Sequence, residues 1–103
     1  MDHNLGLAFR ARKITVGTEM SIQALRNGQV FLMILATDAS DLTKKKVYDK
    51  SKTYHVAVIE SLSSIEISQA IGKKDIKVIG ITDRGFSQLL MNEKRKWLYA
   101  CTK

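Results

Sequence analysis

The sequence contains three apolar runs that lack the alternation of polar and apolar residues found in a half-exposed strand. Val30–Ala36 is continuous, and Tyr54–Glu60 and Ile76–Ile81 are similar runs that include a few polar residues. Strands with such a pattern are buried on both faces of their sheet. Helices must therefore cover both sides of the sheet that these runs form.

Amphipathic segments with helical spacing alternate with these runs, and a β-branched segment, Ile14–Val16, predicts a brief edge strand. Helices are expected over Asn4–Lys13, Thr18–Asn27, Leu42–Lys52 (with Leu42 and Val47 inward) and from Ser63 or Ser64 to Ile71, followed by a long C-terminal helix with Phe86, Leu89, Leu90, Glu93, Trp97 and Leu98. This alternation predicts the α/β class: a three-layer α/β/α sandwich with a small mixed sheet of about four strands.

Capping residues mark where these helices begin and end. The expected N-caps are Thr18, Ser40 or Asp38, Ser63 or Ser64, and Thr82-Asp83, and the glycines that end helices are Gly28 and Gly72. Each predicted helix after Asn4–Lys13 therefore has its own start or stop signal.

The charge balance points to a polyanionic partner. The 103 residues form one expected domain, residues 1–103, with 17 Lys+Arg against 10 Asp+Glu and a net charge of +7. Such an excess favours nucleic acid first and an anionic membrane surface second. No apolar run reaches the ~20 residues that span a bilayer, and Cys101 is the one cysteine. We therefore expect a cytoplasmic protein that forms no intrachain disulfide and makes no membrane contact.

No constellation of catalytic residues stands out. His3 lies near the terminus and His55 opens an expected strand, and neither has a partner at metal-ligand or triad spacing. The turn Gly80–Gly85 lacks a full phosphate-binding pattern. The sequence therefore predicts no enzyme, no catalytic residue, no metal site and no cofactor.

The basic residues form clusters at Lys44-Lys45-Lys46, Lys73-Lys74 and Lys94-Arg95-Lys96. A solvated surface accounts for the last cluster. The first two lie in connections that, with the Gly17 turn, can converge at one end of an α/β sheet. Helix amides and lysines would there meet phosphates, while Glu19 accepts from base N–H donors.

RNA is favoured over duplex DNA by the motifs that the sequence lacks. No helix carries Arg, Asn and Gln along one face for a major groove. Aromatic residues make up 7% of the chain, too few for interleaved stacking on single strands. A compact platform of loops suits a bent, structured RNA with extruded bases.

The order of several short motifs resembles the ribosomal protein L-seven-Ae/L-thirty-e family of kink-turn RNA-binding proteins. These motifs are Leu5–Lys13, Gly17-Thr18-Glu19, Arg26-Asn27-Gly28, Asp38-Ala39-Ser40 with Thr43–Lys46, Glu66–Gly72 and Thr82–Phe86. The resemblance implies the fold predicted above and binding to the kink-turn, a sharp bend with sheared G·A pairs.

The resemblance also implies which residues touch RNA. The family's Gly-Asn-Glu signature falls on Gly17-Thr18-Glu19, with Thr18 in place of asparagine, and the family's next basic position falls on Ile22. The supporting apolar loop falls on Lys73–Lys77, and lysines elsewhere could compensate through phosphate contacts. The predicted RNA-binding set is Lys13, Gly17, Thr18, Glu19, Ile22, Arg26, Lys45, Lys73, Lys74 and Ile76.

The leading hypothesis is a non-catalytic, monomeric protein that binds kink-turn RNA, either ribosomal RNA or an RNA associated with the ribosome. One alternative is an accessory RNA-binding subunit of an RNA-modification enzyme. The other is a protein-interaction module that binds no RNA.

Overall fold

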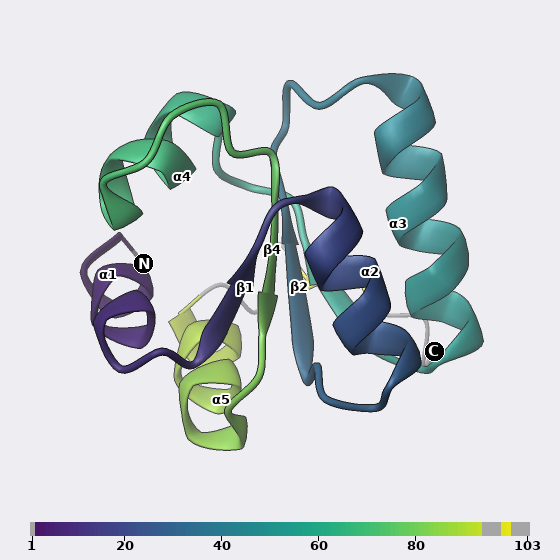
Figure 1. The fold of residues 1–103 in the computed structure, drawn as a ribbon, viewed down its shortest axis with the longest axis horizontal. Helices are drawn as coiled ribbons and strands as arrows, with labels where there is room; N and C mark the ends of the chain where they lie inside the picture. Colours follow the sequence, from purple (N-terminus) through teal and green to yellow (C-terminus); the bar gives the residue numbers. More distant parts are fainter. Residues whose placement is uncertain (1, 94–97, 100–103) are drawn as a thin grey trace.

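Five helices alternate with the strands of one sheet in the computed structural model, which describes residues 2–93 and 98–99 (Figure 1). The helices are α1 (Asp2–Arg10), α2 (Thr18–Arg26), α3 (Asp41–Thr53), α4 (Ser64–Ile71) and α5 (Arg84–Glu93). The strands are β1 (Ile14–Val16), β2 (Leu32–Leu35), β3 (Ala57–Ile59), β4 (Val78–Ile81) and β5 (Leu98–Tyr99).

The sheet is mixed and has the order β1-β4-β2-β3-β5. Strands β2 and β3 run parallel, with Met33 opposite Val58. Strand β4 runs antiparallel to both of its neighbours, so Gly80 lies opposite Met33 on one side and Thr15 on the other. The predicted strands thus form the sheet, β1 lies at its edge as expected, and β5 adds two residues beside β3.

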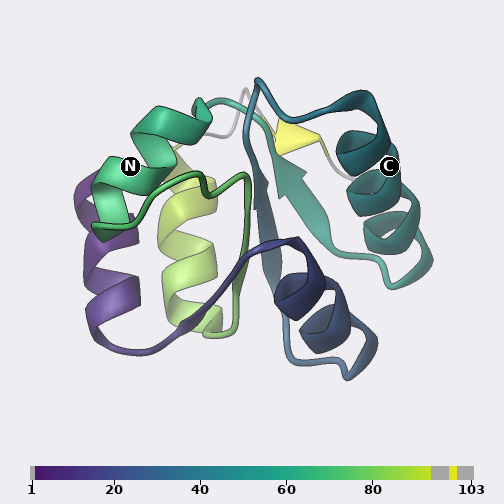
Figure 2. The same cartoon turned by 45° about the horizontal axis from the view of Figure 1, so that its top comes forward.

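Helices cover both faces of the sheet. Helices α1, α4 and α5 lie on one side, and α2 and α3 lie on the other (Figures 1 and 2). Every residue of β2, β3 and β4 is buried. This double cover explains the unbroken apolar runs, and the predicted three-layer α/β/α sandwich is confirmed.

Most predicted helix ends are confirmed. Ser40 accepts from the N–H of Thr43 at the start of α3, and Ser63 forms a reciprocal capping box with Glu66 at the start of α4. Asp83 accepts from the N–H of Phe86 at the start of α5. Gly28 and Gly72 both have positive φ, as expected of residues that end helices.

Thr18 is not an N-cap. Gly17 takes that position with φ 97° and ψ 159°, and Thr18 is the first helical residue. The residue at the N-cap of α2 has a φ that glycine adopts without a steric penalty and that threonine disfavours. The N-cap therefore falls on Gly17, one residue before the predicted position.

Three further local predictions were wrong. Tyr54 and His55 form the turn after α3, because the chain must reverse before β3 begins at Ala57. Leu42 is 78% exposed, since it lies in the first turn of α3 beyond the edge of the core. Leu98 belongs to β5, where pairing with Ile59 satisfies the backbone groups of an edge strand. The predictions for Trp97, Lys94-Arg95-Lys96 and Cys101 lie outside the described residues.

None of the helices in the described part of the chain has the length and apolar character needed to cross a membrane.

Candidate nucleic-acid interface

Four connections meet at one end of the sheet, which we call the first end and define by Gly17, Ala36 and Lys77. The N–H of Gly17 donates to the carbonyl of Val78 over 2.9 Å, and the N–H of Ala36 donates to the carbonyl of Lys77 over 2.8 Å. The N–H of Thr37 donates to the carbonyl of Leu62 over 2.9 Å. The expected convergence is therefore present, because β1, β2 and β3 all finish where β4 begins.

Gly17 sets the geometry at the start of α2. Its φ of 97° lies in a region that side chains rarely adopt, and no atom lies within 4 Å of the place a Cβ would take. The position thus requires glycine for its backbone conformation. The same open space lets another molecule approach the backbone closely.

The first amides of α2 point toward this space. Gly17 offers no capping side chain, and the N–H of Ser21 is the one that donates to the Gly17 carbonyl, over 3.1 Å. The first N–H groups of an α-helix have no partner within the helix and carry the positive end of its dipole. The N-terminus of α2 can therefore receive an anion or a base acceptor.

Glu19 projects from this first turn and is tied to α3. Its side chain is 84% exposed, and its Oε2 accepts from Lys46 Nζ over 2.9 Å. Helices α2 and α3 pack side by side, which brings these residues together across the surface (Figure 1). Nothing local in the sequence pairs Glu19 with Lys46, so sequence reasoning missed Lys46 as part of the site.

The remaining lysines of the α3 cluster differ in their surroundings. Lys44 Nζ lies 3.0 Å from Glu60 Oε2, and Tyr48 donates to the other oxygen of Glu60 over 2.6 Å. Lys45 is exposed. Of these neighbours, Lys45 therefore has the side chain best placed to reach a phosphate.

Asp38 fastens the β2–α3 connection to α4. Its carboxylate accepts from both the N–H and the hydroxyl of Ser64, each over 2.7 Å. These hydrogen bonds, with a smaller contribution from the nearby charge of Lys77, lower the pKa of Asp38 below its ordinary value of 3.8. The carboxylate thus stays charged and holds two loops of the first end in place.

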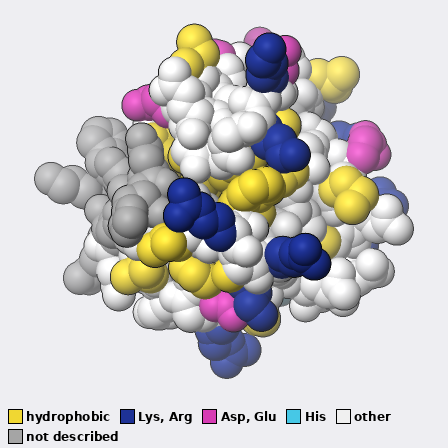
Figure 3. All heavy atoms as spheres, turned by 60° about the vertical axis from the view of Figure 1, so that its left-hand side comes forward, with side chains coloured by type: hydrophobic (Ala, Val, Ile, Leu, Met, Phe, Trp, Pro, Cys, Tyr) yellow, Lys and Arg dark blue, Asp and Glu magenta, His cyan; other side chains and the backbone are white. Residues whose placement is uncertain are grey.

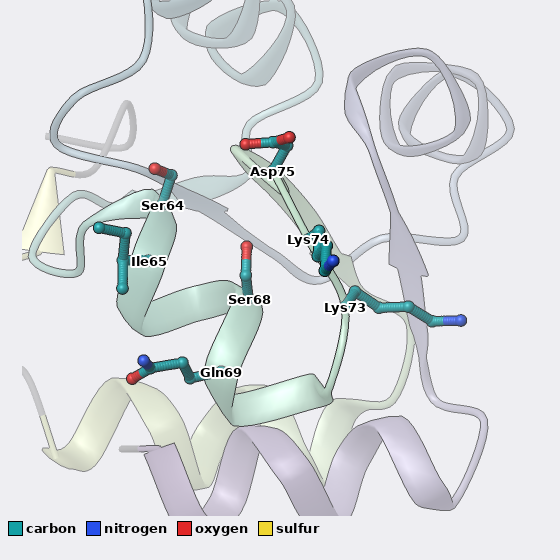
Figure 4. A pocket seen from close by; sticks show the side chains of 7 residues that line it. All are labelled: Ser64, Ile65, Ser68, Gln69, Lys73, Lys74 and Asp75. Atoms are coloured by element: carbon teal, nitrogen blue, oxygen red, sulfur yellow. The ribbon is translucent and has the colours of Figure 1, made fainter.

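The α4–β4 loop borders a hollow of about 230 Å³ at the side of α4 (Figure 4). Lys73 and Lys74 are exposed, and Figure 4 shows Lys73 directed away from the α4 residues. Lys73 Nζ lies 5.6 Å from the centre of the Phe9 ring, within cation–π range. Ile76 is half-buried against the core, where its N–H donates to Ser68 Oγ over 2.9 Å.

A groove of about 350 Å³ runs along α2 toward α3. Glu19 and Lys46 line one part of it, and Arg26 lines another. Ile22 also lines this groove, although it is only 3% exposed and belongs to the hydrophobic core. Its side chain forms the apolar floor of the groove, and its contact with RNA stays a prediction.

Lys13 does not join the first end. Its carbonyl accepts from the N–H of Thr82 over 2.8 Å, at the end of the sheet where β1 begins. Because β1 is extended, Lys13 and Gly17 lie at opposite ends of that strand. The structure thus brings together Gly17, Thr18, Glu19, Lys45 and the α4–β4 loop, but not Lys13.

Within residues 2–93 and 98–99, no group of His, Cys, Asp and Glu side chains is arranged to hold a metal ion. The features that do converge are backbone amides, several cations, and carboxylates, of which Asp38 is held by Ser64 and Glu19 is exposed beside the α2 amides. Such a set suits hydrogen bonding to a base edge and to phosphates.

Comparisons with known proteins identify the family. Residues 1–91 match the model of the Ribosomal protein L7Ae/L30e/S12e/Gadd45 family. An Enterococcus faecium protein named RNA-binding protein YlxQ is 48% identical over 84 residues, which are 82% of this chain and 81% of that protein. The Bacillus subtilis (strain 168) protein of the same name is 40% identical over 88 residues, 85% of this chain and 88% of that protein.

Solved structures share the fold of this chain. A protein with unknown function from Bacillus halodurans C superposes with a TM-score of 0.86 at 43% identity, covering 88% of this chain and 92% of that one. The Giardia lamblia 15.5kD RNA binding protein shares the fold, with a TM-score of 0.78 at 15% identity over 93% of this chain and 82% of that one. The chain therefore belongs to the ribosomal protein L7Ae/L30e/S12e/Gadd45 family.

Proposed function

We propose that this protein binds structured RNA of the kink-turn type without catalysing a reaction. The relatives named RNA-binding protein YlxQ support RNA as the partner class. The observation that carries the finer proposal is Gly17, whose φ of 97° and open space expose the α2 amides beside Glu19.

In this proposal Glu19 accepts hydrogen bonds from N–H groups on a guanine edge. A phosphodiester has no such donor, so this contact distinguishes a base from the backbone. Thr18 contributes a hydroxyl beside it. Lys45, Lys73 and Lys74 contact the phosphates on both sides of the bend and supply affinity that depends on salt. The proposed partner is ribosomal RNA or an RNA associated with the ribosome, and the protein acts as a cytoplasmic monomer.

The decisive experiment compares two RNAs that differ only in the kink. A kink-turn RNA and a variant with its G·A pairs disrupted are titrated in gel shifts at one fixed salt concentration. Preference for the intact kink-turn supports the proposal. Equal affinity for the two RNAs would reduce binding to electrostatic attraction and overturn it.

A further inference from the structure

Acidic and basic residues at the helix ends lie at opposite ends of the sheet. The end opposite the first end, which we call the opposite end, is defined by Lys13, Phe31 and Thr82. Helices α1, α2 and α3 each finish there, since each precedes a strand that begins there (Figure 1). Their last turns carry Arg10, Arg26, Lys50 and Lys52.

Acidic residues gather at the first end for the same reason. The first turns of α2, α3 and α4 carry Glu19, Asp41 and Glu66. Helix dipoles favour acids in first turns and bases in last turns. The topology therefore places the acids of these first turns at the first end and the bases of these last turns at the opposite end.

Four exposed residues, Arg12, Lys13, Phe31 and Arg84, come from segments that meet at this opposite end. The N–H of Thr82 bonds the carbonyl of Lys13, and the N–H of Phe31 bonds the carbonyl of Ile81, each over 2.8 Å. Arg84 follows at the start of α5, and its guanidinium lies 5.2 Å from the centre of the Phe31 ring. We define the Arg84 surface as Arg12, Lys13, Phe31 and Arg84.

Two residues of the Arg84 surface have an unfavourable local setting. Arg84 places a cation at the positive end of α5, whose first turn contains no acid. Arg12 has a φ of 60°, a left-handed conformation that costs a non-glycine residue roughly 1–2 kcal/mol. Arg12 follows the C-terminus of α1, where the helix dipole favours a cation, so its unusual feature is the backbone conformation alone, whereas the charge of Arg84 is unfavourable for its helix.

Phe31 prepares Arg84 for binding. The ring is 37% exposed, and a guanidinium that stacks on an aromatic face keeps its orientation. A fixed guanidinium fork matches two oxygens of a phosphate. The nearest acid along the chain, Asp83, is committed to the cap of α5 through the N–H of Phe86.

We propose that the Arg84 surface is a second RNA-binding surface, which holds the phosphodiester backbone of an RNA segment outside the one bound at the first end. The molecule measures 30 × 28 × 27 Å, and an A-form RNA arm of roughly ten base pairs is long enough to span it. Figure 3 shows Lys and Arg side chains at the lower edge of the α1 side, the edge that corresponds to this end of the sheet. Recognition here rests on phosphate contacts and is independent of base sequence.

The test asks whether two RNAs bind at once. The full chain is saturated with unlabelled kink-turn RNA, and a fluorescent RNA duplex without a kink-turn is then titrated. We expect the duplex to bind this complex. The triple variant R12Q/K13Q/R84Q should weaken duplex binding about tenfold or more and reduce the salt slope by about 2–3, at ~0.9 per phosphate contact.

A matched variant removes the same charge from the first end. K44Q/K45Q/K74Q, at a kink-turn concentration that saturates this variant, should leave duplex binding to the saturated complex within about twofold of wild type, since Lys44 and Lys45 lie near the start of α3 at the first end. Displacement of the duplex by kink-turn RNA, or equal weakening by both triple variants, would overturn the proposal. Vesicles of phosphatidylserine and phosphatidylcholine provide a further control. The proposal would also be overturned if R12Q/K13Q/R84Q abolished binding to these vesicles but left duplex binding intact.

The two proposals fail in different ways. If the wild type does not prefer the intact kink-turn over the disrupted one, the proposed function alone is overturned. The second surface is then tested with the free protein: a loss of duplex binding in R12Q/K13Q/R84Q that exceeds the loss in the first-end variant supports it, and equal losses overturn it. Arg12→Gly separates folding from binding. It removes the charge while relieving the φ of 60°, so the protein should be at least as stable and yet bind the duplex more weakly.

Discussion

Lys46 Nζ donates to Glu19 Oε2 over 2.9 Å and thereby ties the first turn of α2 to α3. Both side chains are substantially exposed, at 41% for Lys46 and 84% for Glu19. An exposed ion pair contributes at most about 1 kcal/mol to folding. The pair therefore matters more for the orientation of Glu19, and for offsetting its repulsion from phosphates, than for stability.

Glu19→Ala should weaken kink-turn binding about 5- to 150-fold, the ~1–3 kcal/mol that a base-edge contact contributes. Binding of a generic duplex should change little, because that RNA is held through phosphates. Gel-shift titration of both RNAs measures the difference. Asp41→Ala is the matched control, since it removes an exposed first-turn acid from α3. A similar effect of both substitutions on the kink-turn would contradict a specific role for Glu19.

Lys46→Met should reduce kink-turn affinity much less in the Glu19→Ala background than in the wild type. The reason is that Lys46 acts in part through the carboxylate it holds. A double-mutant cycle on the two RNAs measures this coupling. Strictly additive losses would mean that Lys46 contacts the RNA independently of Glu19.

Gly17→Asn should lower the free energy of unfolding by about 1–3 kcal/mol, because φ 97° with ψ 159° is accessible essentially to glycine alone. Gly72→Asn provides the comparison. Its φ of 70° and ψ of 30° are left-handed helical values that asparagine tolerates, so its cost should be smaller. Urea denaturation of both variants gives the two values, and equal costs would argue against the geometry at Gly17.

Lys45→Ala should weaken binding of the kink-turn and of its disrupted form alike. It should also reduce the salt slope by about 0.9 if one phosphate contact is lost. Lys44→Ala is the neighbouring control. Lys44 is held 3.0 Å from Glu60, so its removal should alter RNA binding less and cost up to about 1 kcal/mol of stability. A change in kink-turn preference for Lys45→Ala would contradict a pure phosphate contact.

Acid should destabilise the wild type partly through Asp38. Hydrogen bonds from Ser64 lower its pKa in the folded state below 3.8, so its stabilisation is fully present above that pH. The contribution is lost as the pH falls through the folded value. Asp38→Asn should therefore show a smaller loss of unfolding free energy between pH 7 and pH 3. Urea denaturation at the two pH values measures this loss. An equal loss in Asp38→Asn and the wild type would show that Asp38 does not contribute to the acid destabilisation.

The sequence determined the layers of this protein and the ends of most of its helices. Apolar runs such as Val30–Ala36 required cover on both faces, and the caps Ser40, Ser63 and Asp83 act within four residues of chain. Such signals are local or periodic, so they can be read without knowing which elements meet. The Gly17 turn was also visible, although its glycine, not Thr18, occupies the N-cap.

Only the tertiary structure decided which charged residues act together. It joined Lys46 to Glu19 across two helices and sent Lys13 to the end of the sheet away from Gly17. It also buried most of Ile22 in the core and left it lining the groove along α2. The physical reason is that strand direction and helix packing fix these distances, and neither is written in the spacing of residues along the chain.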